Sequence, residues 1–220
     1  ISLGLVGSEM CIRDSINSIK KGSFHNDIVS LATENIFIYH EDAFEDSKQQ
    51  ISDLKTKLQS EKEIFFIEIS NQEIPLEILI KSYLLNSQLV TKKDGEMALI
   101  MPEEVNEYSE CKRWLEKLKG ETPIKDLRYI DIKQSMMNGG GPACLRFKIV
   151  VTEDEFNNIN SNFILNDNLI LKLEDLIQSL YRDSIEIDDL EDPGLISESF
   201  EILDNLTQIF NTGSIYSFQK

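Results

Sequence analysis

The residues from Asn138 to Arg146, Asn-Gly-Gly-Gly-Pro-Ala-Cys-Leu-Arg, combine a glycine loop with one reactive side chain. Glycine adopts backbone angles that other residues resist, and it lets the main chain approach a ligand closely. Pro142 fixes its own φ and favours an extended conformation at Gly141, so the loop has a defined exit. Cys144 then begins Cys-Leu-Arg-Phe-Lys-Ile-Val-Val, a pattern that predicts a half-buried strand. A thiol at the start of a strand, beside a glycine loop, is a candidate nucleophile.

The same stretch also fits a simpler interpretation. Glycine turns often precede strands, and free cysteine is among the most buried residue types. Taken alone, these residues favour a structural Cys144. They do not form a phosphate loop, because no Gly-Lys-Ser/Thr follows and no helix pattern begins there.

Hydrophobic periodicity predicts the elements that would position this loop. Strands are expected at 27–31, 35–39, 64–69, 97–101 and 127–132, and again from Cys144. Helices are expected at 43–60, 76–89, 102–119, 167–182 and 193–210, with a short one after the capping box that begins at Thr152. We expect His40 to lie on the surface at a strand end and Cys111 to pack inside its helix. The alternating order indicates an α/β protein.

Three other segments extend the pattern around Cys144. They are Gly-Ser-Phe-His-Asn-Asp at 22–27, Tyr-Leu-Leu-Asn-Ser-Gln-Leu at 83–89 and the C-terminal Gly-Ser-Ile-Tyr-Ser-Phe-Gln-Lys at 213–220. Together with Asn138–Arg146 they resemble, in the same order, segments of the N-succinylarginine dihydrolase family. Ser217 stands where that family has proline. The resemblance runs from about Ile19 to the C-terminus.

The resemblance implies a fold and a domain organisation. The family belongs to the penteins, α/β propellers of five ββαβ modules around a central site, and this chain would hold roughly the last two or three modules. Residues 16–220 are then expected to be the C-terminal part of a single catalytic domain, inactive or nearly so by itself. Residues 1–15 resemble a translated sequencing adapter, and we expect them to be an artefactual leader outside the fold. A genuine strand at 3–6 is the alternative.

The resemblance also implies a reaction. The family hydrolyses N-succinylarginine twice, through a covalent cysteine adduct, to N-succinylornithine, carbon dioxide and two ammonia in arginine catabolism. Cys144 would be the nucleophile, as a thiolate. His25 would be the general acid and base, because imidazole titrates near neutral pH. The third catalytic residue of the family, a glutamate, and its substrate-binding arginine would lie upstream of Ile1.

Two further residues are candidates for substrate binding. If 27–31 is a strand, positions 25 and 27 point to the same side, so His25 and Asp27 face one pocket. Asp27 would accept guanidinium N–H bonds in a charge-assisted pair. Asn138, at the head of the glycine loop, offers an amide to the substrate. The alternative for His25 and Asp27 is a polar turn in which both side chains serve the backbone.

Composition limits the other classes of function. A net charge of −17 disfavours nucleic acid as a partner, and no apolar run is long enough for a membrane span. Three cysteines make no disulfide framework, which suits the cytoplasm. We expect a small-molecule substrate, a homodimer as in the family, and neither metal nor cofactor. The remaining alternatives are another guanidino-modifying pentein, such as a deiminase or amidinotransferase, and a non-catalytic binding module.

Overall fold

The computed structural model describes residues 15–23, 25–58, 64–137, 140–145, 149 and 151–219. The chain forms two compact units, unit 1 (Ile1–Val150) and unit 2 (Val151–Lys220). Residues 1–14 of the expected leader lie outside the described part of the chain. Its last residue, Ser15, caps helix α1 (Ile16–Lys20), since its hydroxyl accepts from the amide of Ser18 at 3.4 Å.

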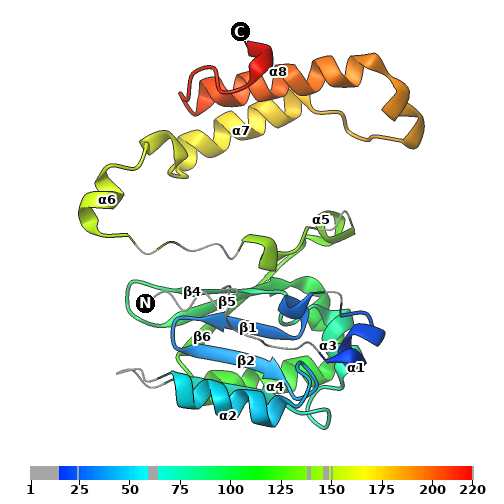
Figure 1. Cartoon of the computed structure of the whole chain (residues 1–220), viewed down its shortest axis with the longest axis vertical. Helices are drawn as coiled ribbons and strands as arrows, with labels where there is room; N and C mark the ends of the chain where they lie inside the picture. Colours follow the sequence, from blue (N-terminus) through cyan, green and yellow to red (C-terminus); the bar gives the residue numbers. More distant parts are fainter. Residues whose placement is uncertain are drawn as a thin grey trace. The chain divides into compact units, whose positions relative to one another are not determined.

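Unit 1 contains two three-stranded sheets with the same chain order (Figure 1). In each sheet an antiparallel hairpin is followed by a helix and then by a third strand parallel to the second. The first set is β1 (Ser30–Thr33), β2 (Ile36–His40), α2 (Ser47–Lys57) and β3 (Phe65–Ile69). The second set is β4 (Gln88–Thr91), β5 (Met97–Pro102), α4 (Ser109–Glu121) and β6 (Ile124–Ile130). Two ββαβ modules are therefore present, joined by α3 (Leu76–Ser82).

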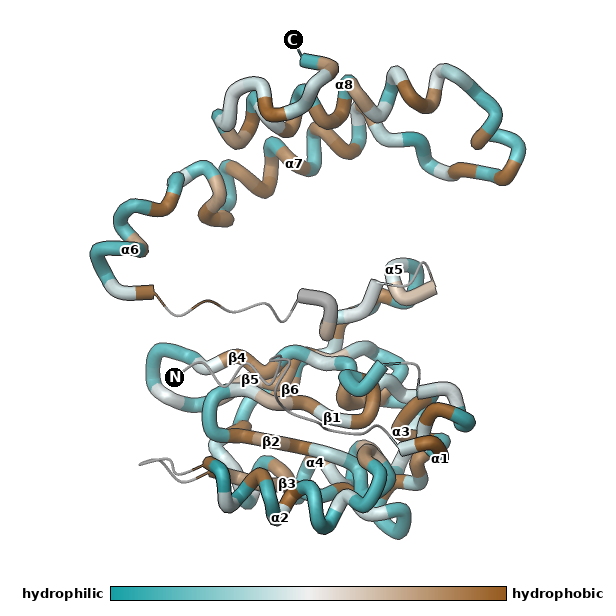
Figure 2. The backbone as a smooth tube through the Cα atoms, in the orientation of Figure 1, coloured by the Kyte–Doolittle hydropathy of each residue, from teal (hydrophilic) through white to brown (hydrophobic). Residues whose placement is uncertain are grey.

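The middle strands β2 and β5 carry most of the core. Every residue of β2 is buried, and Figure 2 shows this strand as hydrophobic. Ile38 pairs with Leu31 of β1 and Ile67 of β3, which fixes the register of the first sheet. Helix α4 covers its sheet with Cys111, Trp114, Leu115 and Leu118, which follow the 3.6-residue period. A fully buried Leu or Ile contributes about 1.5–3 kcal/mol, so these positions dominate the stability of unit 1.

The α/β class and most elements agree with the sequence prediction, but the segments nearest the candidate site differ from it. The strand predicted at 27–31 begins only at Ser30. A 3-10 helix, η1 (Asn26–Ile28), precedes it, because the amides of Ile28 and Val29 turn back to the carbonyls of His25 and Asn26. The strand predicted from Cys144 is also wrong at its start, where the 3-10 helix η3 (Pro142–Leu145) is found.

The helix predicted at 76–89 ends after two turns. Tyr83 adopts the left-handed conformation at φ 53°, which stops α3 at Ser82. The Ser82 hydroxyl then accepts from the amide of Leu84 at 3.3 Å, and the chain turns into β4 at Gln88. The segment 84–89 is turn and strand rather than helix, a distinction that periodicity cannot make for short segments.

Unit 2 is helical. Its elements are α6 (Glu153–Asn157), the 3-10 helix η4 (Ser161–Phe163), α7 (Asp167–Leu180), the 3-10 helix η5 (Ile187–Glu191), α8 (Pro193–Ile209) and the 3-10 helix η6 (Ser217–Gln219). The two long amphipathic helices and the Thr152–Glu155 capping box are as predicted. Arg182, after α7, binds Glu198 of α8 through two bonds of 2.6 and 2.7 Å. Within the described residues, no helix is both long and apolar enough to cross a membrane.

Candidate functional site

The glycine loop is described from Gly140 onward and is held by a short helix on its N-terminal side. Helix α5 (Lys133–Met137) ends before the loop, and the amide of Gly140 donates to the carbonyl of Ser135 at 2.9 Å. A Cβ at Gly140 would lie 2.9 Å from the Ser135 hydroxyl oxygen, so a larger residue would push the serine side chain away. The 3-10 turn Pro142–Leu145 follows, and it includes the backbone of Cys144.

Two side chains hold this turn, one from the segment that leads into β4 and one from the first residue of β4. The Oδ1 atom of Asn86 accepts from the amide of Ala143 at 3.1 Å. The Nε2 atom of Gln88 donates to the carbonyl of Pro142 at 3.3 Å. Asn86 is 9% exposed and Ala143 is 8% exposed, so the first bond is shielded from water. The two residues before Cys144 are therefore tied to the segment 83–89.

The second matched segment forms the turn before β1. His25 is the residue that precedes η1, in an extended conformation, and its side chain is exposed. Its carbonyl accepts from the Ser23 hydroxyl at 3.1 Å and from the amide of Ile28 at 3.2 Å, which holds the backbone at this point. Asp27 lies inside η1 and is partly buried. Positions 25 and 27 therefore do not share one side of a strand, as the sequence predicted, because this segment forms a 3-10 turn.

The strand pair β1 and β4 relates these two turns in space. η1 leads into β1, and η3 is bound to Gln88, the first residue of β4. The two strands contact each other. At their far ends, the Thr91 hydroxyl donates to the carboxylate of Glu34 at 2.6 Å. Both strands run toward hairpin turns on the same side of unit 1 (Figure 1), so η1 and η3 lie at the opposite, shared end of the pair.

Of the four predicted site residues, the structure describes two completely and one through its backbone alone. His25 and Asp27 lie in one turn, and the backbone of Cys144 lies in the other. The side chain of Cys144 and the whole of Asn138 lie outside the described residues. Asn86 and Gln88 were not singled out from the sequence. Their signal was the likeness of 83–89 to the family, to which no role had been attached.

His40 is not a surface residue, as the sequence analysis expected. It ends β2 but is completely buried. Its Nδ1 accepts from the amide of Asp42 at 3.1 Å, so Nε2 carries the hydrogen and donates to the carbonyl of Ile74 at 3.1 Å. Burial lowers the pKa of this imidazole despite the nearby carboxylates of Asp42 and Glu41. These contacts give His40 a structural role.

Cys111 packs inside α4 as predicted. It is fully buried and free, and its thiol lies 3.6 Å from the Ser82 hydroxyl oxygen. Burial raises the pKa of this thiol. A protonated thiol without access to solvent is a poor nucleophile.

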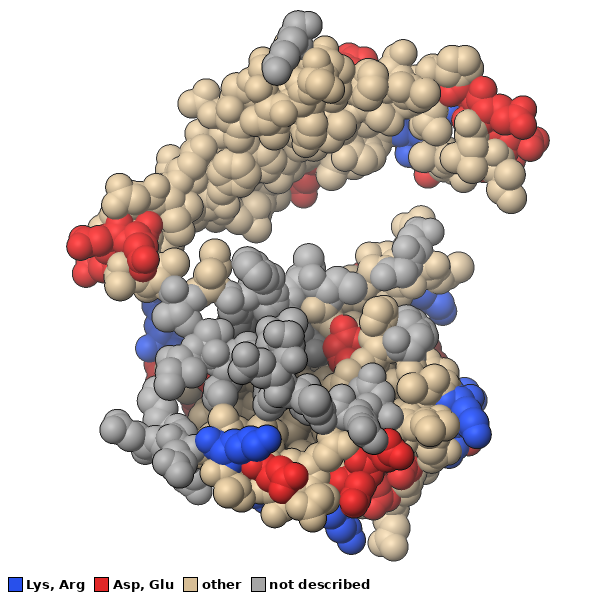
Figure 3. Space-filling view, viewed as in Figure 1, with Lys and Arg blue, Asp and Glu red and all other residues tan. Residues whose placement is uncertain are grey.

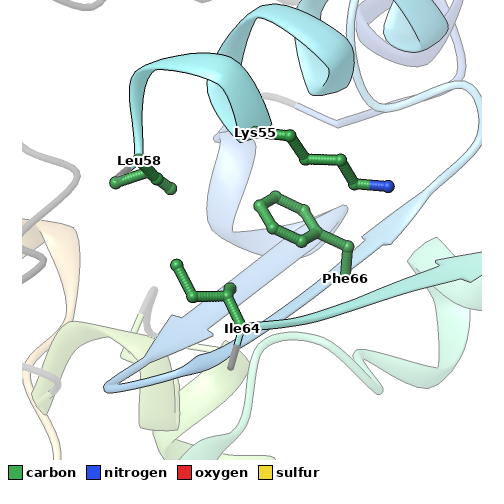
Figure 4. A pocket seen from close by; sticks show the side chains of 4 residues that line it. All are labelled: Lys55, Leu58, Ile64 and Phe66. Atoms are coloured by element: carbon green, nitrogen blue, oxygen red, sulfur yellow. The ribbon is translucent and has the colours of Figure 1, made fainter. Parts of the chain in front are cut away.

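A separate hollow of about 370 Å³ lies beside α2 and β3 and is lined by Lys55, Leu58, Ile64 and Phe66 (Figure 4). The ammonium nitrogen of Lys55 stands 5.0 Å from the centre of the Phe66 ring, a cation–π contact. Three of these four side chains are hydrophobic, and Lys55 is the single polar one. We therefore assign the hollow to packing between α2 and the edge strand.

Charged side chains of both signs are interspersed over the face of unit 1 in Figure 3. Ion pairs also occur in this unit, for example between Lys117 and Glu73 at 2.7 Å. The carboxylate of Glu73 has its pKa lowered, first by the bond from Lys117. This is the pattern of a solvated surface rather than of a polyanion-binding face.

Two ββαβ modules, with a glycine–cysteine turn and a histidine-containing turn at one end of their first strands, define an α/β protein built from repeated modules. The family model for succinylarginine dihydrolase matches residues 6–219. The chain belongs to the succinylarginine dihydrolase family.

The curated relatives agree with this family. N-succinylarginine dihydrolase from Shewanella loihica is 42% identical over 214 residues, which are 97% of this chain and 48% of the relative. The enzymes of the same name from Idiomarina loihiensis and Pseudoalteromonas atlantica are 38% and 41% identical, each over 95% of this chain and 47% of the relative. The chain thus spans about half the length of the curated relatives it matches. These matches do not favour a deiminase, an amidinotransferase or a binding module.

Proposed function

We propose that this chain carries the nucleophile segment of an N-succinylarginine dihydrolase. The observation that carries the proposal is the 42% identity to a protein of that name over 97% of the chain. The structure supports it by tying the backbone before Cys144 to the core and by placing the His25 turn at the same end of the β1–β4 pair. The substrate would be N-succinylarginine, and the products N-succinylornithine, carbon dioxide and two ammonia.

The proposed chemistry follows from the electronic structure of the guanidinium group. Its carbon is a poor electrophile, flattened by resonance, so a strong, soft nucleophile is needed. The Cys144 thiolate would attack this carbon, and one C–N bond would break as ammonia leaves with a proton. Water would then displace sulfur and leave a ureido group. In a second round the thiolate would attack the ureido carbon and expel the second ammonia, and a second water would displace sulfur to leave a carbamic acid. Cleavage of its remaining C–N bond would release carbon dioxide and the amine of N-succinylornithine, so two waters are consumed for each carbon dioxide formed.

The other candidate residues would serve these steps. His25, exposed at the head of η1, would donate the proton to departing ammonia and accept one from water. Asp27 would pair with the guanidinium N–H groups, and Asn138 would bind the substrate through its amide. The positive charge of the substrate would stabilise the Cys144 thiolate in the complex.

The proposal includes a propeller and an assembly. A propeller places equivalent strands of its modules around a central site, and the contact between the first strands β1 and β4 of the two modules supports such an arrangement. A homodimer and a cytoplasmic location, both implied by the family, belong to the same proposal. The oligomeric state is measured by sedimentation or light scattering.

Substitution of Cys144 tests the proposed reaction. In the protein expressed from its complete open reading frame, we expect Cys144→Ser to lose ammonia release from N-succinylarginine by several orders of magnitude while still binding it. A hydroxyl has nearly the shape of a thiol but lacks its nucleophilicity. Cys111→Ala is the matched control, because it removes a buried cysteine outside the site. Retention of more than about a tenth of the rate by Cys144→Ser would overturn the mechanism.

A further inference from the structure

Asn86 makes a contact with the glycine loop that no assigned role explains. Its side-chain oxygen accepts from the amide of Ala143, the residue directly before Cys144, across 57 positions of sequence. Gln88 reaches the preceding carbonyl, that of Pro142. Two consecutive residues of the turn are thus held, one through its N–H and one through its C=O.

Asn86 is itself fixed by the core of unit 1. The backbone amide of Asn86 donates to the carbonyl of Tyr83 at 2.9 Å. This bond closes the turn that begins at Tyr83, whose backbone is left-handed. Leu84, Leu85 and Ser87 around it are fully buried. Because its backbone is fixed and its neighbours are buried, the Asn86 side chain has little conformational freedom. It can therefore hold the loop at a defined position relative to the core.

Gly141 is needed for this contact. A Cβ at position 141 would lie 3.1 Å from Cγ of Asn86 and closer still to its Oδ1. The distance to Cγ is at the lower limit of carbon–carbon contacts, and the distance to Oδ1 is shorter than real Cβ contacts allow. The backbone of the loop therefore lies directly on the Asn86 amide, and the glycine is required for the close approach.

We propose that Asn86, supported by Gln88, is a positioning residue that holds the Cys144 backbone in its reactive place. Its carboxamide fixes the turn one residue before the nucleophile. The inference rests on the proposed function, since it assigns to Asn86 a role in the reaction of Cys144.

The first test is Asn86→Ala in the protein from the complete open reading frame. The loss of the Ala143 bond frees the turn, and a displacement of about 1 Å at a reacting group costs on the order of 100-fold in rate. We expect kcat to fall by about that factor while KM for N-succinylarginine changes little, because substrate contacts remain. We also expect slower native-state alkylation of Cys144 by iodoacetamide, followed by mass spectrometry.

Asn71→Ala is the matched control for a purely structural effect. The Asn71 side chain also accepts from a backbone amide, that of Leu76 at 3.1 Å, but at the start of α3. It should lower the midpoint of thermal unfolding and leave kcat and Cys144 alkylation unchanged. If Asn71→Ala and Asn86→Ala reduce kcat equally, the positioning role is wrong.

A double-mutant cycle tests the contact itself. Gly141→Ala should be severely impaired in kcat, because its methyl group meets Asn86. In the Asn86→Ala background the same substitution should cost at least tenfold less, since the obstructing side chain is gone. Gly120→Ala is the control, because a Cβ at Gly120 has no atom within 4 Å. Additive effects of Gly141→Ala and Asn86→Ala would overturn the proposed contact.

The outcomes separate this inference from the proposed function. If Cys144→Ser remains active, the reaction assigned to Cys144 fails regardless of Asn86. If Cys144→Ser is inactive and Asn86→Ala behaves like the Asn71→Ala control, only the positioning role fails.

Discussion

At the scale of single residues, the two histidines of this chain have opposite surroundings. The side chain of His25 is exposed at the head of a turn. His40 is buried, and both of its ring nitrogens are engaged with the backbone. Their sequence neighbourhoods predict little of this difference, because the burial of His40 depends on the carbonyl of Ile74, 34 positions away.

The burial of His40 makes the stability of unit 1 dependent on pH. Its pKa in the folded state is below the ordinary 6.5, so the unfolded chain binds a proton that the folded chain does not. The contribution of the neutral, buried His40 to the free energy of unfolding is therefore fully present above about pH 6.5. It is lost as the pH falls below that value. We expect the free energy of unfolding in urea to fall by up to about 1.4 kcal/mol per pH unit there. His40→Gln should remove this slope.

His25→Gln is the control for that measurement, since it removes the exposed histidine and keeps His40. Carboxylates titrate mostly below pH 5, so a window from about 6.5 to 5.5 isolates the imidazole. An unchanged slope in His40→Gln would contradict the assignment.

At the scale of elements, the strands with strong β-branched or aromatic patterns were predictable from the sequence. Ile36–His40 and Phe65–Ile69 are examples. The misassigned elements, 27–31, 84–89 and the start at Cys144, are those where turns are closed by local hydrogen bonds or by a left-handed residue such as Tyr83. Such turns depend on backbone conformations that hydrophobic periodicity does not encode. The identities of the candidate site residues could be proposed from the sequence. The contact of Asn86 with Ala143 could not, because it joins segments that are distant in the sequence.

The C-terminal tail of unit 2 shows how a local hydrogen-bond set defines an element. The side-chain nitrogen of Gln219 donates to the side-chain oxygens of Asp204 and Thr207, each at 2.7 Å. Its side-chain oxygen accepts from the backbone amides of Ile215 and Tyr216. Phe218 stacks on Phe200 with ring centres 4.2 Å apart. The tail is thereby folded back onto α8.

Gln219→Met should release this tail, because it keeps the length of the side chain and removes all four bonds. We expect hydrogen exchange at the amides of Ile215 and Tyr216 to accelerate by about tenfold or more, as one net hydrogen bond corresponds to roughly 1 kcal/mol. Gln208→Met is the matched control, since Gln208 bonds the same Asp204 from an exposed position on α8. Equal protection in both variants would show that the stacked rings alone hold the tail.

At the scale of the whole molecule, charge is distributed unevenly. The net charge is −17, and the only basic residues of unit 2 are Lys172, Arg182 and Lys220. Unit 2 holds 15 acidic residues against these 3 basic ones, so a net charge of −12 out of −17 belongs to it. This helical unit also has several exposed large apolar side chains, among them Leu171 and Ile177. Mutual repulsion among its carboxylates opposes the compact state.

Salt should therefore stabilise the chain at neutral pH. Raising ionic strength from about 0.01 M to 0.15 M shortens the screening length from about 30 Å to about 8 Å, which weakens repulsion between distant carboxylates. We expect the midpoint of thermal unfolding, followed by circular dichroism, to rise by a few degrees. Near the isoelectric point of about 4.5 the rise should vanish. A fall in the midpoint at neutral pH would instead show that attractive ion pairs dominate.

The bond between Asn86 and Ala143 also bears on the order of folding. Each ββαβ module closes through contacts between neighbouring elements, whereas this bond joins residues 57 positions apart, on either side of the whole second module. Loop-closure entropy delays such a contact until the intervening β5, α4 and β6 have formed. We therefore expect the turn that contains the Cys144 backbone to be completed late in folding, after the sheet of the second module.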